Sequence, residues 1–355
     1  MIHKKRLLII DKHPFGSITD IHKWCEYLRN DYSITMLCFD TGREKMPMDG
    51  IKFKYVNYNG NFAIRGMRFL LTALWNALFF NGKIMVVYFE NCQWLKYLLP
   101  LKKMIVDIRT LSVSTNAEQR KKYDTLLSKA CRHFDMITAI SEGVKEKLDL
   151  PNKHIEILPL GSDVISKKQK DFSSLKLLYV GTFAGRDLHK TIEGFTQFCK
   201  EYPDINISYD IIGSGFNNEL EEYKTLAATL NVTDKITFHG RLPYNQLKPF
   251  FDKCNIGVSF VPMTDYYDAQ PPTKTFEYIL SGLYTIATAT SSNKELITTE
   301  NGLLIHDSAT DFANALSRIW KIHTKLNEQQ IRQSLEKYSW KSIVNDILKP
   351  ILIQL

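Results

Sequence analysis

Residues 268–288 of the chain read DAQPPTKTFEYILSGLYTIAT. Pro271 and Pro272 stiffen a loop in this stretch, and Gly282 ends a predicted helix over Thr275 to Ser281. The apolar strand YTIAT, residues 284–288, follows directly. A helix that leads into a short apolar strand is the repeating unit of parallel sheets covered by helices, so this stretch predicts an α/β fold.

The same alternation extends on both sides of this stretch. Downstream of residue 174 the other apolar runs are LKLLYVG, ISYDIIG, KITFHG, IGVSFV and GLLI, with helical patterns between most of them. Upstream of residue 161 they include LLIID, SITMLCF, KIMVVYF, MIVDI, MITAI and IEILPL. Strands that are rich in Ile, Val and Leu on both faces predict doubly wound sheets with helices on both sides.

Two such domains are expected from 355 residues, because one domain usually holds about 100 to 200. The polar stretch VISKKQKDFSSLK, residues 164–176, has no periodicity and is predicted to be a linker. The first domain is therefore predicted over residues 1–165 and the second over residues 176–335, with a cleft between them. In open α/β sheets ligands bind at the carboxyl ends of the strands, so this cleft is the expected ligand site.

The composition, with 44% apolar and 24% charged residues, is that of a folded protein. The formal charge of +8 and the isoelectric point near 9.0 favour anionic partners. Lysine and arginine are dispersed along the chain, and no nucleic-acid-binding signature accompanies them. No nucleic-acid partner is therefore expected.

Six dispersed cysteines without a CxxC pair fit a reducing cytoplasm. The apolar run at residues 7–10 is too short for the core of a signal peptide. The most apolar segment, residues 62–80, contains Arg65, Gly66 and Arg68, so no transmembrane helix is predicted. Neither the histidines and cysteines nor TDYYD, residues 264–268, has the setting of a metal site, so no metal is expected.

An anion site is predicted at the start of the helix in the opening stretch. Thr273 and Lys274 lie where free backbone amides and the helix dipole favour negative charge, and Lys274 adds a cation. Glu277 follows three residues later, on nearly the same helix face. Its carboxylate suits a phosphate site if it accepts hydrogen bonds from the hydroxyls of a ribose. A capping interaction or an ion pair between Glu277 and Lys274 is the alternative, and the sequence leaves both open.

Two glycine-containing turns follow apolar strands of the second domain. Gly181 lies in YVGTFAGRDL, and Gly213 and Gly215 lie in IIGSG. Glycine at such a position lets backbone amides approach an anion, or simply makes a tight turn, and both interpretations stay open. Arg186 adds a guanidinium fork that suits a diphosphate.

These motifs resemble those of the retaining glycosyltransferases of family four, the glycosyl transferases group one, which have the two-domain GT-B architecture. The resemblance rests on PPTKTFEYILSG, YVGTFAGRDL, IIGSG, DKITFHGR and ENGLLI in the second domain, and on ITAISEGVKEKL and ILPLGSD in the first. KYSWKSIV resembles the family's terminal helix, which implies that residues 336–355 cross back to the first domain. The resemblance covers the second domain firmly and the first loosely.

This resemblance implies an enzyme that moves a sugar from a nucleoside-diphosphate sugar, of UDP or GDP type, without a separate cofactor. The implied acceptor is a saccharide or a lipid-linked saccharide, in cell-surface polysaccharide synthesis. By similarity, Lys274 and Arg186 would bind the diphosphate and stabilise the leaving nucleotide, which makes them the expected catalytic residues. Glu277 would hold the ribose, and the base would lie near Gly240 and Arg241.

The chain also departs from the family's pattern. Counting back from Glu277 at the family's spacing reaches Ala269, with Asp268 and Gln270 as imperfect substitutes for a carboxylate. Thr182 stands where the family has an arginine, so that cation's role falls to Arg186. These departures leave two alternatives open: a non-catalytic saccharide-binding subunit and a sugar-nucleotide 2-epimerase.

Residues of the first domain are predicted to contact the acceptor. Asp107 and Arg109 lie at the carboxyl end of the strand MIVDI and are expected to face the cleft, although a local ion pair explains them equally well. Gly16 follows the first strand, with His13 nearby, and would let an acceptor or donor approach the backbone.

A mixture of aromatic and basic residues in the first domain suits the surface of an anionic membrane. Residues 62–80 and WLKYLLPLKK, residues 94–103, contain two tryptophans and several cations, namely Trp75, Trp94, Arg65, Arg68, Lys96, Lys102 and Lys103. A buried core helix is the alternative. The protein is accordingly expected in the cytoplasm, with association with the inner face of the membrane left open.

Overall fold

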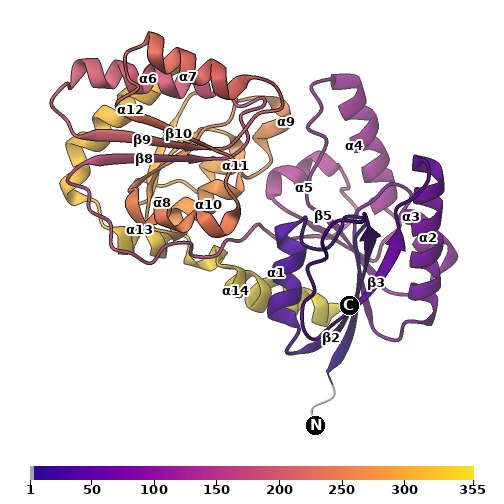
Figure 1. The fold of residues 1–355 in the computed structure, drawn as a ribbon. Coiled ribbons are helices and arrows are strands. Elements are labelled where there is room, and N and C mark those ends of the chain that lie inside the picture. The colour runs from indigo at the N-terminus through magenta and orange to yellow at the C-terminus, as the bar shows by residue number, and fades with distance from the viewer. Residues whose placement is uncertain (1–3) are drawn as a thin grey trace. The chain divides into compact units, whose positions relative to one another are not determined.

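The structure of the protein is a computed structural model that describes residues 4–355. The chain folds into two compact units (Figure 1). Unit 1 comprises Met1–Leu160 and Trp340–Leu355, and unit 2 comprises Gly161–Ser339. The chain passes from one unit to the other after residues 160 and 339. The sequence predicted the ends of the first and second domains at residues 165 and 335.

Unit 1 is built on a parallel sheet in the order β3-β2-β1-β4-β5-β6-β7. Its strands are β1 (Lys5–Ile10), β2 (Tyr32–Asp40), β3 (Ile51–Asn57), β4 (Lys83–Val87), β5 (Met104–Ile108), β6 (Met136–Ala139) and β7 (Ile155–Ile157). Its helices are α1 (Thr19–Leu28), α2 (Phe62–Phe79), α3 (Gln93–Leu98), α4 (Ala117–Cys131), α5 (Glu142–Leu148), α14 (Trp340–Ser342) and α15 (Lys349–Gln354). A π-helical stretch, Ile343–Leu348, joins the last two. Strand β3 was not predicted. Its sequence alternates apolar with polar residues and little of it is buried, because the strand forms one edge of the sheet.

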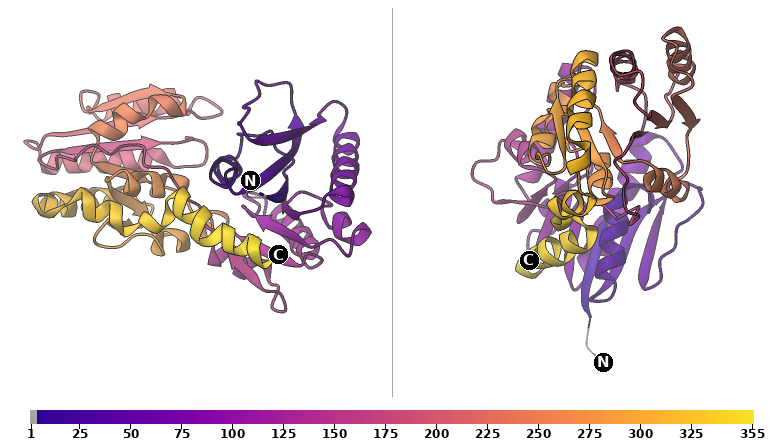
Figure 2. Two further views of the ribbon diagram at one scale, coloured as in Figure 1. Left: turned by 90° about the horizontal axis from the view of Figure 1, so that it is seen from below. Right: turned by 90° about the vertical axis from the view of Figure 1, so that its left-hand side faces the viewer.

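The C-terminal segment of unit 1 packs on α1. Figures 1 and 2 show this segment, in yellow, beside the indigo helix. Trp340, Ile343, Val344 and Leu348 are buried there. Lys349 forms an ion pair with Asp31, just beyond α1. Apolar burial and this ion pair hold the last residues of the chain to unit 1.

Helix α2 buries little of its apolar surface. Asn61 caps its first turn by accepting a hydrogen bond from the backbone of Ile64 at 3.0 Å. Only its narrow stripe of Phe69, Ala73 and Ala77 is buried. A second stripe, repeating every three to four residues, faces outward and consists of Ile64, Met67, Leu71, Trp75 and Leu78, with Trp75 67% exposed. Within residues 4–355, no helix is both long enough and apolar enough to cross a lipid bilayer.

Unit 2 is built on a second parallel sheet, in the order β10-β9-β8-β11-β12-β13. Its strands are β8 (Leu175–Val180), β9 (Ile207–Ile212), β10 (Ile236–Gly240), β11 (Ile256–Ser259), β12 (Tyr284–Thr288) and β13 (Gly302–Ile305). Its helices are α6 (Leu188–Glu201), α7 (Glu219–Thr229), α8 (Lys248–Lys253), α9 (Asp265–Asp268), α10 (Thr273–Leu280), α11 (Ser291–Lys294), α12 (Ala309–Ile322) and α13 (Glu328–Ser334). Helices α6, α7 and α12 cover one face of the sheet, and α8, α10 and α13 cover the other (Figure 1). The predicted class, two doubly wound α/β folds, is confirmed.

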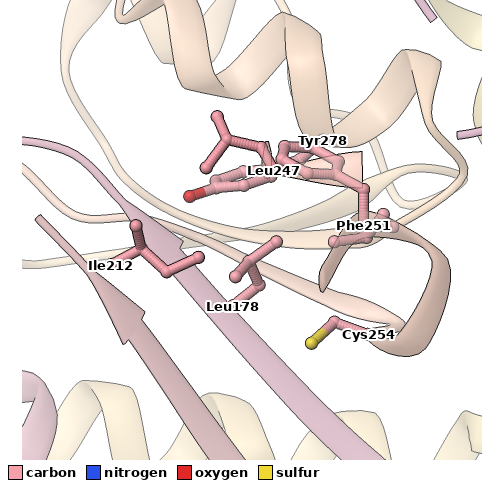
Figure 3. Close-up of a cluster of buried hydrophobic side chains, with 7 residues drawn as sticks. Leu178, Ile212, Leu247, Phe251, Cys254 and Tyr278 are labelled. Carbon is pink, nitrogen blue, oxygen red and sulfur yellow. The ribbon is translucent and has the colours of Figure 1, made fainter. Parts of the chain in front are cut away.

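One cluster of buried side chains joins α8 and α10 to the sheet of unit 2 (Figure 3). It contains Leu178, Ile212, Leu247, Phe251, Cys254, Tyr278 and Leu283. The hydroxyl of Tyr278 also accepts a hydrogen bond from the backbone of Val180 at 2.8 Å. This bond fixes α10 against the carboxyl end of β8.

The predicted linker at residues 164–176 is instead part of unit 2. Ser166, Lys170 and Phe172 are buried. The hydroxyl of Ser281 accepts hydrogen bonds from the backbone of Ile165 and Ser166, at 3.1 and 3.3 Å. A polar composition suggested a free connection, but these side chains pair with unit 2.

Candidate active site

The carboxyl ends of the strands of unit 2 gather most of the predicted glycines. The backbone NH of Gly213 donates to the carbonyl of Gly240 at 2.8 Å, and that of Gly181 donates to Ile212 at 3.0 Å. Strands β8 and β11 are neighbours here, although β9 and β10 lie between them in sequence. Such a reversal of strand order is where doubly wound sheets bind ligands.

Gly213 has a backbone conformation that favours glycine, with φ of +152°. A Cβ at this position would lie 1.8 Å from the carbonyl oxygen of Gly181. Any side chain would therefore push β8 and β9 apart at their ends. The tight turn therefore explains why glycine stands at position 213, and this turn lets the ends of β8 and β9 approach each other closely.

Lys274 lies in the first turn of α10 and reaches back to the end of β8. Its Nζ is 4.1 Å from the centre of the Tyr179 ring. A Cβ on Gly181 would lie only 2.7 Å from this Nζ, so glycine at 181 leaves space for the lysine. Among residues 4–355, no carboxylate lies within ion-pair distance of the ammonium. The direct ion pair with Glu277, one alternative left open above, is therefore not formed.

The charge on Lys274 is held at an energetic cost. Burial lowers the pKa of Lys274 to about 7, and Arg186 lowers it further in the same direction, while Glu277 opposes both. The N-terminus of α10 also has no side-chain cap, because Pro272 precedes it. Free amides, a helix dipole and a cation without a paired anion thus meet at one point.

Arg186 supplies a second cation near this point. It follows β8 in a loop, and its guanidinium lies 4.3 Å from the centre of the Tyr267 ring of α9. Its Nη1 is buried and has no hydrogen-bond partner within the described part of the chain. A buried donor without a partner costs free energy, which an anionic ligand would recover. Tyr267 was missed from the sequence, since nothing local links it to Arg186.

Glu277 lies one turn further along α10 and is partly buried. Burial raises the pKa of its carboxyl group to about 7, Asp163 raises it further, and Lys274 lowers it. Burial also raises the pKa of Tyr244, and the charges of Glu277 and Asp163 add to that shift. These three groups of unit 2 therefore lie close together. Asp163 and Tyr244 were not predicted as site residues.

The remaining predicted donor-site residues lie around this centre with fewer contacts. Thr273 is exposed at the start of α10, and Arg241 is exposed just after β10. Gly240 has φ of +66° and open space where a Cβ would be. Gly215 is covered by a carboxylate, since its Cβ would lie 2.1 Å from Oε2 of Glu219. That carboxylate disfavours a phosphate at Gly215.

Asp107 and Arg109 of unit 1 belong to a buried ion-pair group. Asp107 is 0% exposed, and its carboxylate accepts a hydrogen bond from the Thr138 hydroxyl at 2.6 Å. Arg109 lies 3.6 Å from Asp107 and also pairs with Asp20 of α1. Burial raises the pKa of Asp107 to about 6, although Arg109 opposes this. The expectation that both face an acceptor is wrong for this arrangement, and the local ion pair accounts for them.

A cavity of about 590 Å³ lies at the carboxyl ends of β1, β2 and β4 in unit 1. Its lining includes His13, whose Nδ1 is 2.7 Å from Oδ1 of Asp11. Gly16 is not in this lining and has φ of +89°, with Met46 packed where a Cβ would be. The prediction that Gly16 makes room for a ligand is therefore not supported by its surroundings. The cavity itself was not predicted, because its walls come from several segments that lie far apart in the sequence.

Comparison with known proteins identifies a family that matches part of unit 2. Residues 174–321 match the model of the family described as glycosyl transferases group 1. They form a glycosyl transferases group 1 domain. The resemblance stated from the sequence and the predicted enzyme class, a glycosyltransferase, are confirmed. The match of residues 174–321 to this family supports sugar transfer from a nucleotide sugar.

Solved glycosyltransferase structures share the fold over the whole chain. Sucrose-phosphate synthase from Thermosynechococcus elongatus has a TM-score of 0.77 at 16% identity, and the match covers 99% of each chain. The lipopolysaccharide outer core galactosyltransferase WaaB has a TM-score of 0.73 at 14% identity, over 99% of this chain and 100% of that one. Anabaena HepE in complex with UDP and glucose has a TM-score of 0.74 at 12% identity, with the same coverage. Comparison with curated protein sequences gave no significant match.

The positions where this glycosyltransferase departs from the family's pattern are occupied by local contacts. Ala269 is buried. The carboxylate of Asp268 accepts hydrogen bonds from the backbone and hydroxyl of Ser291, at 2.8 and 2.6 Å. The Gln270 amide donates to the carbonyl of Tyr266 at 2.7 Å. The two neighbours of Ala269 are thus engaged within unit 2.

Proposed function

We propose that this glycosyltransferase binds the diphosphate of a UDP- or GDP-sugar between Lys274 and Arg186. The observation that carries the proposal is that both cations lie at the reversal of strand order and that neither is paired with an anion from residues 4–355. Arg186 disfavours the charged form of Lys274, and a diphosphate would neutralise both cations. HepE, which shares the fold, has been crystallised with UDP and with UDP-glucose.

The proposed chemistry is electrostatic. As the glycosidic bond breaks, negative charge grows on the departing diphosphate, and Lys274, Arg186 and the free amides of α10 stabilise it. Glu277 accepts hydrogen bonds from the ribose hydroxyls of the nucleotide. By resemblance to family four, the sugar is transferred with retention of its anomeric configuration. No metal is required in this scheme, since two cations already neutralise the diphosphate.

The acceptor that we propose is a saccharide or lipid-linked saccharide in the synthesis of a cell-surface polysaccharide. WaaB, named as a lipopolysaccharide galactosyltransferase, shares the fold, and this likeness supports the proposal.

The proposed function is tested by measuring the release of nucleoside diphosphate from UDP- and GDP-sugars, with and without EDTA. Release that EDTA leaves unchanged is the expected result. Absence of release with any donor would favour a non-catalytic saccharide-binding subunit, and NMR of the product's anomeric proton tests retention.

We also propose that helix α2 rests on an anionic membrane surface. The outward stripe of α2 lies next to the exposed residues Trp94 and Leu98 of α3. Together they form a continuous apolar patch, which differs from the single exposed apolar residues that are common on protein surfaces. Three cations, Arg6, Lys52 and Lys54, line a hollow with Trp75 and Phe79 at one end of α2. Apolar side chains beside cations are typical of interfacial binding. Of the predicted cations, Lys96 is instead buried and paired with Asp135 at 2.9 Å.

Replacing both Leu71 and Trp75 with glutamine is expected to reduce membrane binding at least tenfold. Each loses roughly 1.5–3 kcal/mol of apolar transfer free energy if it is buried in the bilayer. The measurement is flotation with vesicles that contain anionic lipid, with Leu126→Gln, an exposed leucine of α4, as the matched control. Equal flotation of the double variant and the wild type would contradict membrane binding through α2.

A further inference from the structure

The cavity of unit 1 occupies the place where its own sheet reverses strand order. Strands β1 and β4 are neighbours, although β2 and β3 lie between them in sequence. Lys12 and His13 follow β1, and Phe89 and Glu90 follow β4, and all four line the cavity. Doubly wound sheets bind their ligands at this point. The cavity volume of about 590 Å³ lies within the range of small-molecule sites.

Aromatic side chains form one apolar part of the wall of this cavity, and several of them pack against one another. Phe39, Phe69 and Phe89 form a continuous row, with ring centres 4.7 and 5.1 Å apart. Tyr58 extends the row, 5.1 Å from Phe39. A free sugar offers mostly hydroxyls, and burying them against such walls without hydrogen bonds would cost free energy. An apolar chain loses nothing there and gains by leaving water.

The cavity is also lined by charged residues, which lie outside the row of aromatic rings. Arg65 lies 4.2 Å from the centre of the Tyr58 ring, and Lys12 is partly buried near the end of β1. Glu90 is the carboxylate in this lining, and His13 pairs with Asp11. Two cations and one carboxylate suit an anionic group attached to the apolar chain.

The cavity is continuous with the apolar surface of α2. Phe62, Gly66 and Met67 of α2 line it, and Met67 also belongs to the outward stripe. Phe62 is 70% exposed, so an apolar chain leaving a membrane would remain in contact with apolar side chains until it entered the cavity.

We propose that this cavity binds the hydrocarbon chain of a lipid-linked saccharide, which is the acceptor of the glycosyl transfer, with the phosphate that joins the chain to the saccharide beside Lys12 and Arg65. The inference rests on the proposed function, because it assigns the chemical class of the acceptor. It excludes a free oligosaccharide as the group held in this cavity.

Gly66 offers a way to fill the cavity without disturbing the fold. It lies within α2, and no atom is within 4 Å of the position that its Cβ would take. Gly66→Ala and Gly66→Leu should both raise the melting temperature of unit 1, by about 2–4 °C, because each removes a glycine from a helix. The two variants differ only in the volume that leucine adds to the cavity.

The experiment is isothermal titration of the full chain with dodecyl phosphate below its micelle concentration. Wild-type protein and Gly66→Ala should bind one molecule per chain, and Gly66→Leu should bind it at least tenfold more weakly. Dodecyl glucoside should bind more weakly than dodecyl phosphate, and inorganic phosphate should not displace the bound chain. Equal affinities of the two Gly66 variants, or of the two dodecyl compounds, would overturn the proposal.

Two further readouts separate this proposal from its alternatives. UDP and GDP are titrated into the same samples. If a nucleotide binds but dodecyl phosphate does not, only the assignment of the acceptor is refuted. If neither UDP nor GDP binds, the proposed function itself is refuted. Sedimentation tests whether a second copy of the chain covers the cavity. A dimer that Gly66→Leu disrupts, with no binding of dodecyl phosphate, would overturn the proposal.

Discussion

Lys274→Met is expected to weaken donor binding at least 100-fold while making the free protein more stable at pH 7. Methionine keeps the length and the contact with Tyr179 but removes the charge that meets the diphosphate. Breaking a buried charge pair costs about 2–5 kcal/mol, which sets the size of the expected loss. Isothermal titration with UDP and GDP measures it, alongside thermal unfolding of the free protein.

The gain in stability follows from the sign of the pKa shift. The folded pKa of Lys274, about 7, lies below the ordinary value of 10.5, so the unfolded chain binds more protons between these values. Stability therefore rises with pH across this window, and the buried lysine costs most at and below pH 7. Lys274→Met should gain stability on the order of 4 kcal/mol at pH 7, and the gain should vanish toward pH 10.5.

The same shift predicts how donor binding depends on pH. A bound diphosphate favours the charged lysine, so binding should take up a proton near pH 7 and weaken by up to tenfold for each pH unit above it. Lys190→Met is the control, because Lys190 pairs with Asp187 at 3.0 Å on α6 and should leave affinity and its pH dependence unchanged. If Lys274→Met binds UDP and GDP as the wild type does, the lysine does not hold the diphosphate.

Arg186→Gln is expected to lower kcat by about 100- to 1000-fold, because the guanidinium stabilises charge that develops in the transition state. Arg186→Lys keeps the charge but loses the fork and its stacking on Tyr267, and should recover only part of the rate. Steady-state kinetics of nucleoside diphosphate release with a donor sugar measure both variants.

Tyr267 provides an independent test of the role of Arg186. Tyr267→Leu should lower kcat by about 2- to 30-fold through the loss of a cation–π contact, whereas Tyr267→Phe, which keeps the ring, should restore it. A kcat that is unchanged in Arg186→Gln would show that this arginine does not stabilise the leaving group.

Local structure around the proposed donor site could be predicted from the sequence where the signal was local. Lys274 and Glu277 lie one turn apart on a helix whose start and end are marked by Pro272 and Gly282. Gly213 follows a strand at a position where only glycine fits. These constraints act over a few residues, so they can be recognised without knowing the rest of the fold.

Features that depend on distant contacts were missed or misjudged. Asp107 and Arg109 looked accessible at the end of a strand, but α1 brings Asp20 onto them and closes the group. The segment at 164–176 looked like a free linker, but Ser281 and Arg332, more than a hundred residues away, bind its backbone. The cavity of unit 1 is lined by several segments between residues 12 and 94, and no local sequence pattern predicts that these segments come together.

A crystal structure of the protein with bound UDP, and a second with GDP, test the central claim most directly. The account predicts that the diphosphate of at least one nucleotide lies within ion-pair distance of both Lys274 and Arg186, at the N-terminus of α10. A nucleotide bound elsewhere, with these two cations in contact with water alone, would contradict it.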